Sequence, residues 1–232
     1  MIEFHQVKKI YGTQTALSVE NLQIKQGECV GLIGNNGAGK TTLLSLILDL
    51  IPATEGFVKS KDKIVSKTED WKTYTGSFLN EGFLIPYLTP IEFLEFIAGL
   101  HHKNIADVKQ FIADNAGFYV DNMYEKKYLR ELSAGNKNKV GILATMLINP
   151  EIIILDEPFA NLDPSSQSWL KLKIKELHAN GITFIISSHD LRHVTEISSR
   201  VLLIENGLII KDTHTNPDTL QELENYFQPQ FS

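Results

Sequence analysis

The segment from Gly34 to Thr42 carries the strongest chemical signal, and its first eight residues match the pattern G-x-x-x-x-G-K-[ST]. Glycines in such a loop let backbone N–H groups turn toward phosphate oxygens. A helix expected to begin near Lys40 directs its positive dipole end at the same oxygens. Lys40 would supply charge to the terminal phosphates, and Thr41 a hydroxyl to Mg²⁺. The pattern predicts a nucleotide-phosphate site formed by Gly34, Asn35, Asn36, Gly37, Ala38, Gly39, Lys40, Thr41 and Thr42.

A second signal is an apolar run, residues 152–155, that ends in Asp156 and Glu157. Ligands of open α/β sheets bind at the carboxyl ends of parallel strands. We expect Asp156 to hold Mg²⁺ directly or through water, and Glu157 to position or deprotonate an attacking water. The alternative is a solvated acidic loop after a core strand. The presence of a phosphate loop in the same chain favours the catalytic interpretation.

The elements around these motifs alternate between strands and helices. Apolar runs predict strands at 29–33, 152–155 and 182–186, and helical patterns follow each of them. A capping-box spacing, Thr89 to Glu92, with proline at the first helical position predicts a helix start inside a mostly helical region. The prediction is an α/β phosphate-loop NTPase core with a parallel sheet, an antiparallel β subdomain and an inserted helical lobe. Its bounds are about 1–84 and 149–215 for the core, about 85–148 for the lobe and about 216–232 for a short C-terminal helix.

Composition narrows the class of protein further. The chain has 232 residues, of which 43% are hydrophobic and 22% charged, as in ordinary packed proteins. Its net charge of −6 disfavours non-specific nucleic-acid binding. No apolar stretch approaches the roughly 20 residues of a membrane-spanning helix, and residues 1–9 lack the apolar segment of a signal peptide. We therefore expect a cytoplasmic protein that binds no nucleic acid.

A third motif, residues 132–136, reads Leu-Ser-Ala-Gly-Asn. It resembles the L-S-G-G-Q signature of the ATP-binding cassette (ABC) ATPases. Tyr11 resembles the aromatic residue that stacks on adenine in that family, and residues 160–163 resemble the loop, ending in Asp, that crosses the dimer interface. His189 resembles the switch histidine that contacts the γ-phosphate. The resemblance extends from about residue 2 to 210 and implies ATP as ligand together with Mg²⁺.

The resemblance also implies partners. In the family, the signature binds nucleotide held by a second cassette, so Ser133, Gly135 and Asn136 would complete a site in a homodimer or heterodimer. The cassettes act on multi-spanning permease subunits, which would place this chain on the inner face of the membrane. Short single-cassette chains of this kind often serve exporters, so an export-type partner is expected. The expected docking surface lies around residues 80–96.

Two positions depart from the family pattern. Asn136 stands in place of the usual Gln of the signature and keeps an amide. The stretch that corresponds to the family's Gln loop, residues 78–82, contains no Gln. Asn80 or Glu81 must fill that role, which is to bind Mg²⁺ or its water, and both remain candidates.

The resulting hypothesis is an ATP-binding and ATP-hydrolysing subunit of an ABC transporter. The alternative is a soluble ABC-type ATPase that acts on ribosomes or DNA. Such proteins usually carry two cassettes or a long coiled-coil insertion, and the negative charge also argues against it. A small kinase or GTPase is disfavoured by the signature and by the lack of a suitably placed Asn-Lys-x-Asp motif.

Overall fold

The computed structural model describes residues 1–118 and 126–228 of the chain. The chain forms two compact units, Met1–Trp71 with Thr183–Ser232, and Lys72–Ile182. The phosphate loop belongs to the first unit, and the acidic strand and the helical region belong to the second. Among the described residues, no helix combines the length and apolar character needed to cross a membrane.

The first unit contains a mixed arrangement of strands in the order β5-β4-β1-β2-β10-β9-β3-β8. On one side β1 pairs antiparallel with both β2 and β4, and on the other β3 pairs parallel with both β8 and β9. The predicted antiparallel subdomain and parallel core are both confirmed. The strands are β1 (Ile2–Tyr11), β2 (Gln14–Ile24), β3 (Cys29–Ile33), β4 (Glu55–Ser60), β5 (Lys63–Ile64), β8 (Thr183–Ser188), β9 (Arg200–Glu205) and β10 (Leu208–His214).

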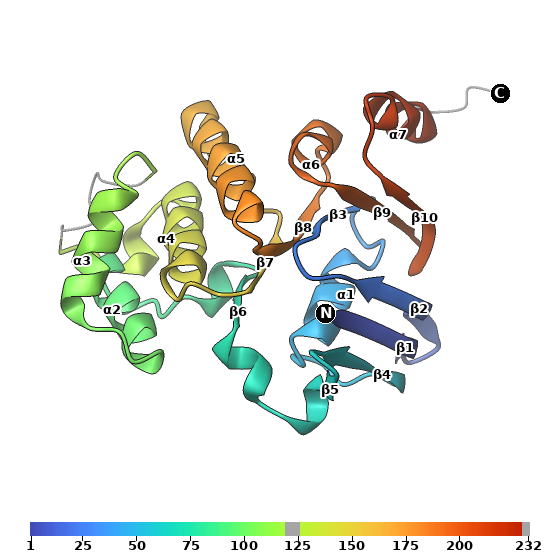
Figure 1. Ribbon diagram of the computed structural model, residues 1–232, viewed down its shortest axis with the longest axis horizontal. Helices are drawn as coiled ribbons and strands as arrows, with labels where there is room; N and C mark the ends of the chain where they lie inside the picture. The colour runs from blue at the N-terminus through green and yellow to red at the C-terminus, as the bar shows by residue number, and fades with distance from the viewer. Residues whose placement is uncertain (119–125, 229–232) are drawn as a thin grey trace. The chain divides into compact units, whose positions relative to one another are not determined.

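Helices cover the parallel part of the first unit. The predicted C-terminal helix packs beside α6 (Figure 1), and its Leu223 joins an apolar cluster with Ile33, Val194 and Leu203. Burial of these side chains ties the last helix to the strand that leads into the phosphate loop. The helices are α1 (Lys40–Ile47), α6 (Leu191–Ile197) and α7 (Thr219–Phe227).

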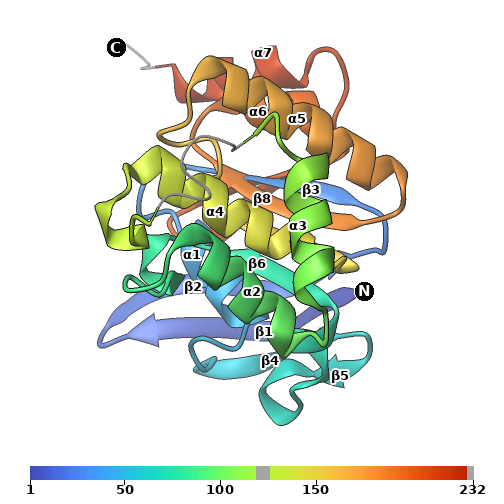
Figure 2. The ribbon, with the colours of Figure 1, turned by 90° about the vertical axis from the view of Figure 1, so that its left-hand side faces the viewer.

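The second unit is built on two parallel strands and a helical layer. Phe78 of β6 pairs with Leu155 of β7. One helix, α4, is buried over most of its length, from Val140 to Leu147, and Figure 2 shows α2, α3 and α4 as neighbours. The elements are β6 (Thr75–Phe78), β7 (Ile152–Asp156), α2 (Pro90–Leu100), α3 (Ile105–Asp114), α4 (Ala134–Leu147) and α5 (Pro164–Ala179).

A local signal in the sequence located the start of α2. Thr89 and Glu92 form the predicted capping box of α2, and Asp190 caps α6 through the N–H of Arg192 at 2.9 Å. Short 3-10 helices, which were not predicted, occupy Val65–Lys67, Asp70–Thr73, Glu81–Phe83 and Leu129–Glu131. Residues 119–125 of the predicted lobe and 229–232 of the predicted C-terminal helix lie outside the described residues.

Candidate functional site

The phosphate loop occupies residues 34–39, between the fully buried strand β3 and helix α1. Asn35, Asn36 and Gly37 form its exposed tip. Gly39 is the N-cap of α1 with φ of 115°, in the left-handed region that favours glycine. Because Gly39 has no side chain, it cannot cap the helix, and the first turn of α1, which the structure describes in full, contains no acidic residue. The helix start therefore presents its positive end toward the loop.

Lys40, the first residue of α1, directs its side chain back to this loop. Its side chain is only 6% exposed, and Nζ donates to the carbonyl oxygens of Gly34 at 2.6 Å and of Asn35 at 3.3 Å. The N–H of Gly207 donates to the oxygen of Ala38 at 2.8 Å and fastens the loop to the β9–β10 turn. An ammonium group and helix N–H groups thus converge on one loop, which is the donor set that a polyphosphate requires.

The chain leaves strand β8 at His189, at the same edge of the sheet as the phosphate loop. Strand β8 runs parallel to β3, and Ser188 pairs with Ile33. The next residues, His189 and Gly34, therefore follow neighbouring strand ends. His189 is exposed, so its ring is accessible at this edge.

Tyr11 ends β1 in the same unit. The residue is 52% exposed, and it pairs with Gln14 across the β1–β2 turn. The Nζ atom of Lys9 lies 4.7 Å from the centroid of the Tyr11 ring. Sequence reasoning missed Lys9, although its spacing of two residues from Tyr11 places both side chains on the same face of the strand.

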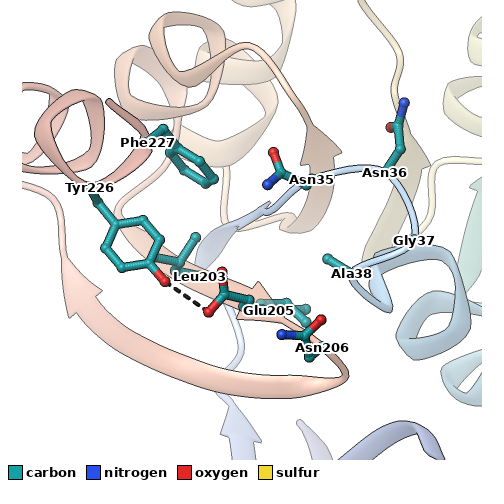
Figure 3. A pocket seen from close by; sticks show the side chains of 10 residues that line it. Asn35, Asn36, Gly37, Ala38, Leu203, Glu205, Asn206, Tyr226 and Phe227 are labelled. Atoms are coloured by element: carbon teal, nitrogen blue, oxygen red, sulfur yellow. Dashed lines mark hydrogen bonds between the residues drawn. The ribbon is translucent and has the colours of Figure 1, made fainter. Parts of the chain in front are cut away.

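A small cavity of about 120 Å³ lies between the phosphate loop, the β9–β10 turn and α7 (Figure 3). Asn35 and Asn36 line it on one side, and Glu205, Tyr226 and Phe227 on the other. The hydroxyl of Tyr226 donates to Glu205 Oε2 at 2.9 Å. That hydrogen bond to a carboxylate raises the pKa of Tyr226. The C-terminal helix therefore borders the outer side of the loop.

In the second unit, the acidic residues and the Gln-loop segment meet at one sheet edge. Because Phe78 and Leu155 pair in parallel strands, Asp156 at the end of β7 and Asn80, two residues beyond the end of β6, lie at the same sheet edge. Asp156 and Glu157 are both half-buried. Glu157 has φ of 50°, a left-handed conformation that costs a non-glycine residue on the order of 1–3 kcal/mol. Such backbone strain is concentrated at functional sites.

The two Gln-loop candidates make different contacts. Asn80 Oδ1 accepts from the N–H of Gly82 at 2.8 Å and caps the short helix over Glu81–Phe83. Glu81 Oε2 pairs with Nζ of Lys137 on α4 at 2.7 Å. Asn80 thus supports its own loop, whereas Glu81 links the loop to the signature helix. Sequence reasoning did not identify Lys137, because its partner Glu81 lies 56 positions earlier in the sequence.

The signature lies at the start of α4. Ser133 is the exposed N-cap, and its Oγ accepts from the N–H of Asn136 at 3.3 Å. A Cβ atom on Gly135 would lie 2.3 Å from the carbonyl oxygen of Asn161. Asn138 Nδ2 donates to the oxygen of Ala160 at 2.8 Å. The signature and the loop at 160–163, predicted as separate motifs, are therefore in direct contact.

Asp163 adds an ion pair to the contact between the signature helix α4 and the loop at 160–163. Lys139 Nζ lies 3.2 Å from Asp163 Oδ2. Asp163 also caps α5 by accepting from the N–H of Ser166 at 2.9 Å. Hydrogen bonds from the hydroxyls of Ser165 and Ser166 hold the pKa of Asp163 well below its usual range. A charged carboxylate therefore holds the loop end against the signature helix.

Comparison with known proteins identifies the family of this chain. A family model described as ABC transporter matches residues 17–160. The linearmycin resistance ATP-binding protein LnrL of Bacillus subtilis is 30% identical over 211 residues, which are 90% of this chain and 68% of that protein. The spermidine/putrescine import ATP-binding protein PotA of Bacteroides fragilis is 33% identical over 214 residues, 90% of this chain but only 46% of PotA.

A solved structure supports the same assignment. The dimeric structure of MJ0796, a bacterial ABC transporter cassette, is similar with a TM-score of 0.84 and 25% identity. The match covers 93% of this chain and 99% of that one. The family match, the relatives and the fold agree, and the chain belongs to the ABC transporter family as an ATP-binding domain with ATPase activity.

Proposed function

We propose that the chain is the ATP-hydrolysing subunit of a transporter whose membrane-spanning subunits are separate polypeptides. The observation that carries the proposal is the exposed N-terminus of α4, where Ser133 is the N-cap and Asn138 of the same helix donates to the oxygen of Ala160 in the loop at 160–163. This end offers a hydroxyl and N–H groups to a phosphate. In this proposal a complete site pairs the phosphate loop of one cassette with the signature of a second cassette, and the two are related by two-fold symmetry.

Each proposed site residue has a defined task. Lys40 and the N–H groups at the start of α1 bind the phosphates, and Tyr11 stacks on adenine. His189 contacts the γ-phosphate. Ser133, Gly135 and Asn136 bind the nucleotide held by the opposite cassette.

The residues that would hold Mg²⁺ are Thr41 and Asp156. Asn80 or Glu81 would be a further ligand of the ion or of its water. Hydroxyl, carboxylate and amide oxygens are the ligands that this ion prefers. When bound, Mg²⁺ neutralises negative charge on the phosphate oxygens. Both candidate oxygens have partners in the chain, since Glu81 pairs with Lys137 and Asn80 Oδ1 accepts from the N–H of Gly82, so both residues stay candidates for this role.

Glu157 is the proposed base. The oxygen of a water attacks the γ-phosphorus, the bond from that phosphorus to the bridging oxygen breaks, and ADP leaves with the oxygen. The proton of the water passes to the carboxylate of Glu157. The left-handed backbone at Glu157 directs the chain into a sharp turn after β7, with the N–H of Ala160 donating to the oxygen of Glu157 at 3.1 Å.

Docking to the membrane subunits is proposed at a groove of about 220 Å³ in the second unit. Phe83, Phe93 and Ile97 line the groove. Phe83 is 50% exposed, and Tyr87, four positions further along the chain, is 65% exposed. Contiguous exposed apolar patches are typical of interaction sites. Docking there would hold the chain at the cytoplasmic face of the membrane. The relatives include a resistance protein and an import protein, so export remains a prediction that depends on the membrane subunit.

The experiment is affinity isolation of the tagged chain from detergent-solubilised membranes of its native cells. We expect a multi-spanning protein to be isolated with the wild type and to be lost with Phe83→Glu/Tyr87→Glu, while ATP binding is retained. Leu172→Glu is the matched control, because Leu172 is an exposed apolar residue of α5 outside the groove. Isolation with ribosomes or DNA in place of a membrane protein would overturn the proposal.

A further inference from the structure

The ammonium group of Lys9 lies against the ring of Tyr11, in the first unit. Lys9 is only 9% exposed, whereas Tyr11 is 52% exposed. Nζ of Lys9 lies 4.7 Å from the centroid of the ring, within the distance of a cation–π interaction. A largely buried cation thus lies against an aromatic ring that is itself open to solvent.

The surrounding backbone fixes this cation in place. Lys9 Nζ donates to the carbonyl oxygen of Pro52 at 2.9 Å. Two hydrogen bonds hold the same segments together, from the N–H of Thr54 to the oxygen of Lys8 at 2.8 Å and from the N–H of Ile10 to Thr54 Oγ1 at 3.0 Å. Pro52 lies between α1 and β4, so Lys9 connects the Tyr11 ring to the segment that follows the phosphate-loop helix.

We infer that Lys9 is a positioning residue for the nucleotide base. The inference rests on the proposed role of Tyr11 as the adenine platform. Attraction between the cation and the ring holds the ring in one orientation before the base arrives, so less side-chain freedom is lost on binding. The cation also attracts the π electrons of the Tyr11 ring. This attraction reduces the repulsion between the ring and the π electrons of the base.

The test compares binding of ADP with binding of pyrophosphate, a probe with phosphates and no base. Lys9→Met keeps an unbranched apolar side chain and removes the charge. We expect it to weaken ADP binding about 2- to 5-fold, because a cation–π contact on a solvent-accessible ring contributes about 0.5–1 kcal/mol. Pyrophosphate binding should remain as in the wild type. Lys9→Arg keeps a cation and should restore ADP binding.

The neighbouring residue offers a matched control. Lys8 lies on the opposite face of β1 and pairs with Glu55 at 2.9 Å. Lys8→Met removes the same charge from the same strand and should leave the affinity for both probes unchanged. Melting temperatures of all variants should be measured, so that a loss of folding is not taken for a loss of base binding.

A double-mutant cycle separates this inference from the role of Tyr11. Tyr11→Ala should weaken ADP binding, and Lys9→Met added to it should have no further effect. If Tyr11→Ala binds ADP like the wild type, the proposed adenine platform is wrong. If Tyr11→Ala weakens ADP binding but Lys9→Met does not, Lys9 is not a positioning residue. Equal weakening of ADP and pyrophosphate by Lys9→Met would also overturn the inference.

Discussion

Replacement of Gly135 by alanine tests the contact between the signature helix and the loop at 160–163. A Cβ atom at this position would lie 2.3 Å from the carbonyl oxygen of Asn161, below the closest approach of 3.0 Å seen for real Cβ atoms. The two segments must therefore separate by at least about 0.7 Å, the difference between these distances. The atom that must give way belongs to the backbone, in a loop held by a hydrogen bond and an ion pair from α4.

The size of the effect follows from two opposing terms. Overpacking of this kind costs about 1–3 kcal/mol of folding stability. The helix preference of alanine over glycine offsets up to about 1 kcal/mol, and less in the first turn, where Gly135 lies. We expect a net loss of about 1–2 kcal/mol, which for a chain of this size lowers the melting temperature by about 2–8 °C. Turnover should fall about 10- to 100-fold, because displacements near 1 Å can cost this much in rate.

The assay measures thermal unfolding and ATP turnover of Gly135→Ala beside Gly99→Ala. Gly99 lies in α2 of the same unit, and its added Cβ would meet no atom within 4 Å. The control should keep its turnover and melt at the wild-type temperature or up to about 4 °C higher. Wild-type stability and turnover in Gly135→Ala would show that the signature and the loop do not need this close contact, and would refute the reasoning.

Three further predictions concern the nucleotide. Lys40→Ala should weaken ATP binding or abolish turnover while circular dichroism shows an intact fold, because it removes the ammonium group inside the loop; wild-type affinity and turnover would contradict the phosphate-loop role. Glu157→Gln should bind ATP, lose about 10²–10⁴-fold in turnover and accumulate as a long-lived dimer, whereas His189→Ala should slow hydrolysis without trapping that dimer; near-normal hydrolysis by Glu157→Gln would place water activation elsewhere, with Glu81 examined first. Ser133→Arg should block ATP-driven dimerisation in size-exclusion runs and spare nucleotide binding by the monomer; unchanged dimerisation would rule out the opposite-subunit role of Ser133.

Features that depend on contiguous residues could be predicted well. The helix start at Thr89 and Glu92 was identified from residue spacing and is confirmed. Strand β6 was missed, because its sequence, Thr-Gly-Ser-Phe, lacks both an apolar run and an alternating pattern. Its position is decided by pairing with β7, whose partner residues lie far along the chain.

The sequence by itself determined the chemistry available to this protein, since the phosphate-loop pattern, the carboxylates after an apolar run and the signature are each properties of a short stretch. Only the tertiary structure decided which of these groups meet. The pairing of Ser188 with Ile33 brings His189 to the loop edge, and the approach of α4 sets Gly135 against Asn161. The tertiary structure likewise gave Glu81 its ion-pair partner on α4. Such contacts join residues distant in the sequence, and they depend on the packing of whole elements, which local spacing does not encode.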